Sequence, residues 1–243
     1  MHIALIALAA AQTVRTLPAD MPALNLVADH AHVTVRSVPG ATETVVTATG
    51  QRWSEGCALD FSGSSQEATV SVVLPDEFAA RCKTEIDVAL AGDTKVSTDI
   101  GRGSVELKDL AVDSHIVLGQ GRVRGTTTAD FTQVQVQRGR VELVDLRVPV
   151  DVDVAFGGAL LEYDEAIAGT IASRVGLGRN RVLFPYGVWL DKEIDAVVGR
   201  TTTAIPTRVS SNTKLVARTG LGSVHVDTVL VDDLGDEAVA YIP

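Results

Sequence analysis

The chain has 243 residues, enough for one domain or two small ones, and 46% of them are apolar although only 4% are aromatic. Its 31 acidic and 21 basic residues give a net charge of -10, which repels phosphate backbones and anionic bilayers over a Debye length and excludes nucleic acid as an expected partner. An interior of Val, Leu, Ile and Ala suits narrow, stacked β-structure.

The first segment, residues 1–11, is apolar and ends in small residues, which is typical of a secretory signal cleaved after Ala11. It lacks the Lys or Arg that usually opens such a signal. No later stretch approaches the roughly 20 apolar residues of a transmembrane helix. The sequence predicts an exported protein without a transmembrane segment, located in the periplasm, at the cell surface or outside the cell.

Residues 12–83 form an N-terminal β section in this prediction. The β-branched and apolar runs 24–27, 32–35, 44–47 and 68–74 are expected strands, separated by turns at Pro39-Gly40 and 62–65. The spacing of these runs is irregular. We therefore expect this section to be the opening part and cap of the regular body that follows.

Cys57 and Cys82 are the two cysteines of the chain. A zinc site or a redox pair would need further ligands or a Cys-x-x-Cys spacing, and the sequence offers neither. An even pair in an exported chain favours one structural disulfide, which would contribute about 3.5 kcal/mol in the chain-entropy model.

A glycine-centred unit recurs from residue 84 to residue 226. The later glycine of each unit falls at intervals of 18 to 23 residues, which is too short for helical repeats. These glycines are Gly103, Gly121, Gly139, Gly158, Gly178, Gly199 and Gly222.

Strict alternation of apolar and polar residues in 133–137 and 150–154 indicates strands around these glycines. With sharp glycine turns, Val105, Val123 and Val141 would stack in one inward column, and Leu107 and Leu143 in a second. The predicted fold class is therefore all-β. It is a single elongated parallel β-solenoid (β-helix) of about 18–21-residue coils over 84–226, with the irregular N-terminal section as one cap and the acidic tail 227–243 as the other.

This pattern resembles the bacterial putative-adhesin family, exported β-solenoid domains of largely unknown function. The resemblance is carried by the early strand motif AHVTV at 31–35, the Leu74-Pro75 step, the Gly-x-Gly-x-Val units and the closing ARTGLGSV at 217–224. It spans the mature chain and implies adhesion in a general sense. It supplies no catalytic residues.

His30 and His32 are the candidates for a metal site, because alternate residues of a strand point to the same side. A third ligand is not evident, so solvent-facing imidazoles at a turn are the favoured interpretation. Nucleophile elbows and phosphate-binding loops are missing from the sequence, and the Gly-x-Gly units precede strands where a dinucleotide site needs a helix. No catalytic residue, metal or cofactor is expected.

Arginines recur beside the glycines and would form a column if the units are in register. Such a column needs neutralisation, either by interleaved carboxylates such as Glu106, Glu142, Asp109 and Asp145 or by an anionic ligand such as an acidic glycan. The candidate ligand ladder comprises Arg102, Arg122, Arg138, Arg140, Arg179 and Arg181.

The enzyme alternative is a carbohydrate-active lyase or glycosidase built on a β-helix. Asp151 and Asp153 would project outward from one strand, with Glu142 or Glu162 on neighbouring strands. Such carboxylates are also expected on any solvated strand.

The sequence therefore favours an exported, non-enzymatic, adhesin-like binding or structural module of the cell envelope or surface. Its expected partners are an envelope or extracellular polysaccharide or a surface protein. A carbohydrate-active enzyme is one alternative, and an envelope-stress sensor or regulator that binds a protein partner is another.

Overall fold

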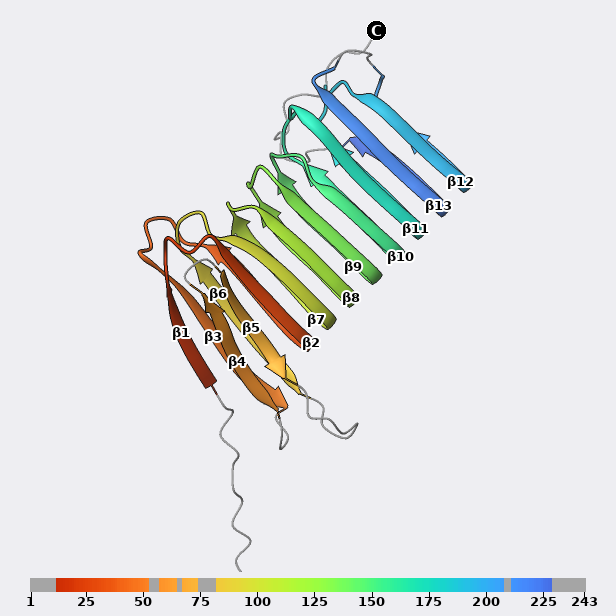
Figure 1. Ribbon diagram of the computed structural model, residues 1–243. Coiled ribbons are helices and arrows are strands. Elements are labelled where there is room, and N and C mark those ends of the chain that lie inside the picture. Colours follow the sequence, from red (N-terminus) through yellow and green to blue (C-terminus); the bar gives the residue numbers. More distant parts are fainter. Residues whose placement is uncertain (1–11, 53–56, 65–66, 74–81, 208–210, 229–243) are drawn as a thin grey trace, which may run out of the picture.

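The computed structural model describes residues 12–52, 57–64, 67–73, 82–207 and 211–228. Over these ranges the chain forms 13 strands that belong to one mixed β-sheet (Figure 1). In the same ranges no helix is long and apolar enough to cross a membrane. The expected signal, 1–11, and nearly all of the expected C-terminal cap lie outside the described residues.

Apart from β2, the strands before β7 are short, and the strands from β7 onward are long. Their bounds are β1 Gln12–Pro18, β2 Ala23–Ser37, β3 Glu43–Arg52, β4 Ala58–Ser64, β5 Glu67–Val73, β6 Lys83–Leu90, β7 Lys95–Leu110, β8 Ser114–Thr127, β9 Thr132–Leu146, β10 Asp151–Tyr163, β11 Gly169–Phe184, β12 Asp191–Thr203 and β13 Thr213–Thr228.

The sheet branches at β2, as Figure 1 shows at the end that begins with β1. The first half of β2 pairs with β5, and β5 pairs antiparallel with β4. The second half of β2 pairs with β6, and an antiparallel run continues through β3 to β1. The other edge of β2 pairs in parallel with β7 along nearly its whole length. β2 therefore joins the antiparallel section to the parallel one.

The parallel section runs in the order β2, β7, β8, β9, β10, β11, β13, β12. β2 has Ala31 opposite Gly103. Each of the other strands places a glycine opposite the glycine of its neighbour, for example Gly103 opposite Gly121 and Gly121 opposite Gly139. In β10 the aligned residue is Gly157, one residue earlier than predicted, and it lies opposite Gly139 and Gly178. The expected alignment of the glycine units is otherwise present.

The predicted single parallel β-solenoid is wrong, because the sheet is mixed and its strands are out of chain order. A solenoid stacks successive coils one after another. Here β2 pairs in parallel with β5, β6 and β7, none of which follows it directly in the chain, and β13 lies between β11 and β12. The spacing of the glycine units predicts where each strand bends and which residues it buries. It does not predict which strands become neighbours.

Each strand from β7 onward bends at its aligned glycine. In β8, Ile116 and Leu118 are buried before Gly121 and Val123 is buried after it, so the alternation changes phase at the bend. The bend of β11 is sharp, because it brings Ser173 and Asn180 together, and the Ser173 hydroxyl donates a hydrogen bond to the Asn180 amide oxygen at 2.8 Å. Seven residues of extended strand would span about 23 Å. Both halves of a strand therefore face one interior.

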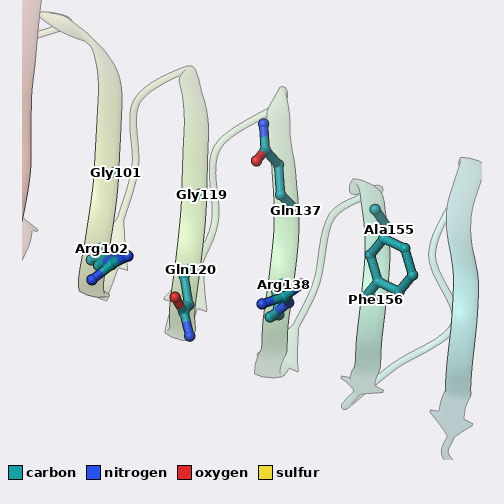
Figure 2. Close-up of a pocket in the computed structure, with 8 residues that line it drawn as sticks. All are labelled: Gly101, Arg102, Gly119, Gln120, Gln137, Arg138, Ala155 and Phe156. Atoms are coloured by element: carbon teal, nitrogen blue, oxygen red, sulfur yellow. The ribbon is translucent and has the colours of Figure 1, made fainter.

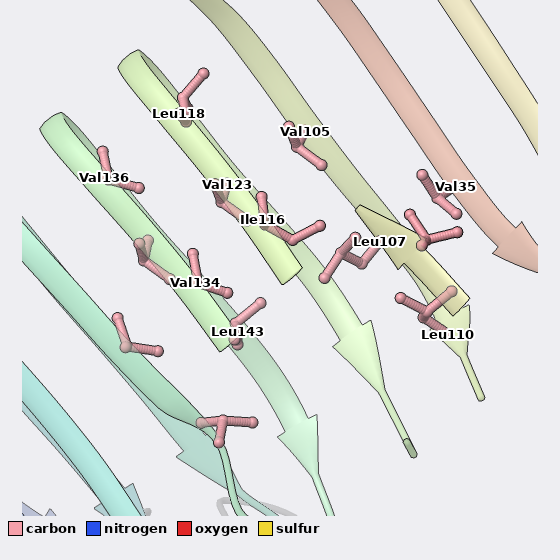
Figure 3. Close-up of a cluster of buried hydrophobic side chains, with 14 of the residues drawn as sticks. Val35, Val105, Leu107, Leu110, Ile116, Leu118, Val123, Val134, Val136 and Leu143 are labelled. Carbon is pink, nitrogen blue, oxygen red and sulfur yellow. The ribbon is translucent and has the colours of Figure 1, made fainter. Parts of the chain in front are cut away.

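The interior consists of aliphatic columns that run across the strands (Figure 3). Val105, Val123 and Val141 are in register and fully buried, which confirms the predicted column. Leu107 and Leu143 are also buried, on either side of Gly125 in the ladder. Because each strand contributes only a few of these side chains, the core exists only when the strands stack.

At the end of the strand order, β12 departs from this pattern. Its inward positions include Lys192 and Thr203, where the paired residues of β13 are Leu215 and Val226. The Lys192 ammonium donates to the Thr203 hydroxyl at 3.0 Å and to the Ile205 carbonyl, and burial lowers the pKa of this lysine. An inward charge of this kind discourages further strands from adding to the edge.

The predicted disulfide is present. Cys57 precedes β4 and Cys82 precedes β6, with 5.7 Å between their Cα atoms, and Cys82 is buried. The bond ties the β4–β5 branch to the β6 branch of the sheet.

Replacing Gly121 by Ala should lower the free energy of unfolding by at least about 3 kcal/mol, because the added Cβ would lie 1.8 Å from the Gly103 carbonyl oxygen. The matched control is Gly40→Ala, since Gly40 also has a positive φ but no atom within 4 Å of the added Cβ; it should cost about 1 kcal/mol. Urea unfolding of both variants checks this. Equal losses would show that the bend tolerates a side chain.

Replacing Cys57 and Cys82 together by Ser should lower the free energy of unfolding by about 3.5 kcal/mol, because the unfolded chain regains the entropy of an open loop of 25 residues. Urea unfolding of the variant, and of the wild type in reducing agent, gives the measurement. A loss below about 1 kcal/mol in both cases would contradict a stabilising role.

Candidate binding surface

The residues that flank the bend form two outward rows across the parallel strands. We call the residues directly before the bend the leading row and those directly after it the trailing row. In the order β2, β7, β8, β9, β10, β11, β13, β12, the leading row is His30, Arg102, Gln120, Arg138, Phe156, Leu177, Leu221 and Val198. The trailing row is His32, Ser104, Arg122, Arg140, Gly158, Arg179, Ser223 and Arg200.

The six arginines of the expected ladder are all exposed, but they do not share one column. Two are in the leading row, three are in the trailing row, and Arg181 lies two residues beyond the trailing row, opposite Leu160. The position relative to the bend glycine decides the row, so that Arg138 and Arg140, two residues apart on either side of Gly139, belong to different rows.

Glu142 neutralises two arginines of the trailing row. It accepts a hydrogen bond from Arg122, and its carboxylate also lies 3.7 Å from the Nε atom of Arg140. The hydrogen bond from Arg122 is the main reason why the pKa of Glu142 is lowered. Glu106 forms a similar pair with Arg124, 3.1 Å from its Nη2 atom.

The expected carboxylate partners Asp109 and Asp145 do not contribute to this neutralisation. Both have left-handed backbone conformations, with φ of 48° and 53°. The Asp109 carboxylate accepts a hydrogen bond from the Thr126 hydroxyl at 2.9 Å.

The other four arginines of the candidate ladder differ from this pair. Within the described ranges, none of the ion pairs includes Arg102, Arg138, Arg179 or Arg181. Their guanidinium groups are exposed and available to an external anion.

Two of these guanidinium groups border a shallow groove across β7, β8, β9 and β10, with a volume of about 480 Å³ (Figure 2). Gly101 and Gly119 line the groove, and because they have no side chain the space above them stays open. Arg102 and Arg138 lie along it on alternate strands, and the exposed ring of Phe156 stands at one end. The full lining is Gly101, Arg102, Gly119, Gln120, Gln137, Arg138, Ala155 and Phe156.

The two candidate histidine ligands lie on either side of the buried Ala31 in β2. His32 is engaged through its Nδ1 atom with the Ser104 hydroxyl at 2.6 Å. Burial is the main cause of a lowered pKa for His30, followed by the charge of Lys83. Among the residues that the structure describes, no group of three or more His, Cys, Asp or Glu side chains could hold a metal ion.

The carboxylates of the enzyme alternative are divided between the two sides of the bend. Asp151 accepts a hydrogen bond from the Nη1 atom of Arg174 at 2.8 Å, whereas Asp153 lies opposite Gln135 and Arg174 in the ladder. Asp151 and Asp153 precede the bend of β10. The other two candidates, Glu142 and Glu162, follow the bends of β9 and β10.

An exposed apolar stretch of the leading row was missed by the sequence reasoning. It occupies four adjacent strands, and with Val197 we call it the apolar ridge. Its signal was present in the sequence, because each member except Val197 stands directly before the bend glycine of its unit. The ridge consists of Phe156, Leu177, Leu221, Val198 and Val197.

Comparisons with known proteins give matches at the level of structure. No protein-family model matches the chain, and no curated protein matches its sequence. A crystal structure of a putative adhesin from Bacteroides fragilis is 10% identical, with a TM-score of 0.47, over 89% of this chain and 97% of that one. A putative cell adhesion protein from Clostridium sporogenes is 9% identical, with a TM-score of 0.39, over 91% of this chain and 100% of that one.

A third structure, of a putative adhesin from Parabacteroides distasonis, is 11% identical, with a TM-score of 0.33, over 90% of this chain and 97% of that one. The names of the three structures agree with the family that the sequence pattern resembles. At these scores they carry no functional information about this chain.

Proposed function

We propose that this chain is an exported, non-enzymatic, adhesin-like binding module of the cell envelope or surface, and that it binds an anionic polysaccharide along the glycine bend. The observation that carries the proposal is the groove on β7 to β10. Its two guanidinium groups, from Arg102 and Arg138, have no carboxylate partner within the described part of the chain.

The side chains of the groove supply the contacts that an acidic sugar polymer requires. A guanidinium group can bind a carboxylate with two parallel hydrogen bonds. The amide of Gln120, in register between Arg102 and Arg138, can hydrogen-bond sugar hydroxyls. The exposed ring of Phe156 offers an apolar face. Arg102 and Arg138 are two strands apart, about 9.6 Å, so they can engage two separate anionic groups of one polymer.

The sheet presents these contacts on a rigid support. The strands below the groove are hydrogen-bonded on both sides and anchored by buried aliphatic columns. Binding of a ligand therefore requires little loss of conformational entropy from the protein. Several weak contacts along one polymer add avidity.

The disulfide supports the export part of the proposal. Disulfides persist in oxidising compartments such as the periplasm and the extracellular space. The Cys57–Cys82 bond joins two branches of the sheet and is an integral part of the fold.

The observed contacts give less support to a carbohydrate-active enzyme. Such an enzyme generally holds two carboxyl groups about 5 to 9.5 Å apart across the scissile bond. Asp151 and Glu142 are each engaged by an arginine, and they lie on opposite sides of the bend. No contact specifically favours a sensor or regulator.

The test is binding of the purified protein to polygalacturonate, with fully methyl-esterified polygalacturonate as the uncharged comparison. Wild type should bind only the charged polymer, and Arg102→Gln with Arg138→Gln should weaken binding at least about tenfold, because two charge-assisted contacts are lost. Isothermal titration calorimetry gives the affinities.

The matched control is Arg124→Gln with Arg174→Gln. It removes the same charge from two exposed arginines that are already paired with Glu106 and Asp151, and it should bind like wild type. Equal losses in both double variants would show a bulk charge effect and contradict a groove-specific site. Polymer turnover that Asp151→Asn or Asp153→Asn abolishes would contradict the non-enzymatic part.

A further inference from the structure

The apolar ridge is a continuous exposed strip along the bends of β10, β11, β13 and β12. The exposed fractions are 52% for Phe156, 46% for Leu177, 51% for Leu221, 58% for Val198 and 77% for Val197. Because the first four are in register on adjacent strands, they lie about 4.8 Å apart and form a strip about 15 Å long. An aligned strip of this kind marks an interaction surface more clearly than scattered exposed residues do.

The ridge lies on the outer side of the bend. Residues on both sides of each bend glycine are exposed or half-buried, and the buried residues lie further along both halves of the strand. Leu177, Leu221 and Val198 do not line the groove of Arg102 and Arg138, and Phe156 is the member of the ridge that does. A protruding apolar strip suits a soft, deformable surface into which side chains can insert.

Cationic groups run beside the ridge. Arg179 follows Leu177 by two residues, Arg200 follows Val198 by two, and both are exposed. Neither takes part in an ion pair with another described residue. On the other side of the ridge, Arg174 and Arg218 are neutralised.

The partners of those two neutralised arginines are Asp151 and Glu193. Asp153 and Asp195 occupy the same outward row as Arg174 and Arg218. The free positive charge is therefore concentrated on the trailing side of the ridge.

We propose that the apolar ridge docks onto an anionic lipid surface. Leu177, Leu221 and Val198 would insert at the boundary between headgroups and acyl chains, as the apolar face of an interfacial element does. Arg179 and Arg200 would contact lipid phosphates while their aliphatic stems pack along the ridge. This docking does not depend on the polysaccharide groove, which shares only Phe156 with the ridge.

The net charge of -10 repels an anionic surface, but salt screens this repulsion beyond the Debye length, about 8 Å at physiological ionic strength. Docking must therefore rest on short-range contacts of the ridge and its two arginines. Such binding is reversible and modest.

The test uses the full chain and sedimentation with vesicles of phosphatidylcholine that contain 30% phosphatidylglycerol or none. Wild type should partition at least tenfold more strongly onto the anionic vesicles. Leu177→Ser with Val198→Ser and Leu221→Ser should reduce that partitioning more than tenfold, as should Arg179→Gln with Arg200→Gln.

The matched control is Phe131→Ser. Phe131 is 52% exposed and directly precedes β9, eight residues before the bend glycine, so it lies outside the ridge. This variant should partition like wild type. Thermal unfolding checks that the exposed substitutions leave the fold intact.

Wild type that ignores anionic vesicles would overturn the proposal, as would a triple variant that partitions like wild type. If the triple variant loses a dimer seen by light scattering while its vesicle binding is unchanged, the ridge binds a second copy, and the proposal is wrong. Loss of polygalacturonate binding in the triple variant, without loss of vesicle binding, would assign the ridge to the polysaccharide site instead.

Discussion

The structure depends on the close approach of backbones at the bend of each parallel strand. At Gly121 the position of a Cβ atom is already occupied by the Gly103 carbonyl oxygen, and at Gly178 the corresponding distance to the Gly157 oxygen is 1.6 Å. Only glycine fits, so each bend is locked opposite the bend of its neighbour. The in-register columns of the core and the two outward rows all follow from this alignment.

The same alignment separates the chemistry of the surface from that of the core. Inward positions must be filled by aliphatic residues, but the residues next to the glycine face outward and are free to vary. The leading row therefore changes from arginine and glutamine on β7 to β9 into aromatic and aliphatic residues on β10 to β12. The line of bends across the sheet therefore carries a cationic groove on β7 to β10 and an apolar ridge on β10 to β12.

The sequence was sufficient for the features that depend on local spacing. The glycine period predicted the bends, and the buried column of Val105, Val123 and Val141 followed from strand alternation. It was insufficient for the strand order, because pairing of β2 with β7 and insertion of β13 beside β11 depend on contacts between distant segments. The solenoid prediction failed for this reason.

The exposure of the candidate arginines followed from the sequence, whereas their arrangement and their partners did not. The arginines beside the glycines do face solvent, but they are divided between the leading row, the trailing row and the position of Arg181 beyond it, because some precede the bend glycine and others follow it. The pairing of Arg122 and Arg140 with Glu142 also depends on the neighbouring strand. The ridge was missed because apolar residues near glycines are normally assigned to a core, and only the aligned bend shows that Leu177 and Leu221 project outward.

The most direct test of the aligned bends is cysteine cross-linking between neighbouring strands. Arg179 lies opposite Ser223, whereas Arg200 is separated from Arg179 by the whole of β13. Because a disulfide requires Cα atoms closer than about 7 Å, Arg179→Cys with Ser223→Cys should form a bond under mild oxidation, and Arg179→Cys with Arg200→Cys should not. Peptide mapping that finds the bond in the second variant and not in the first would contradict the strand order and the register of the bends.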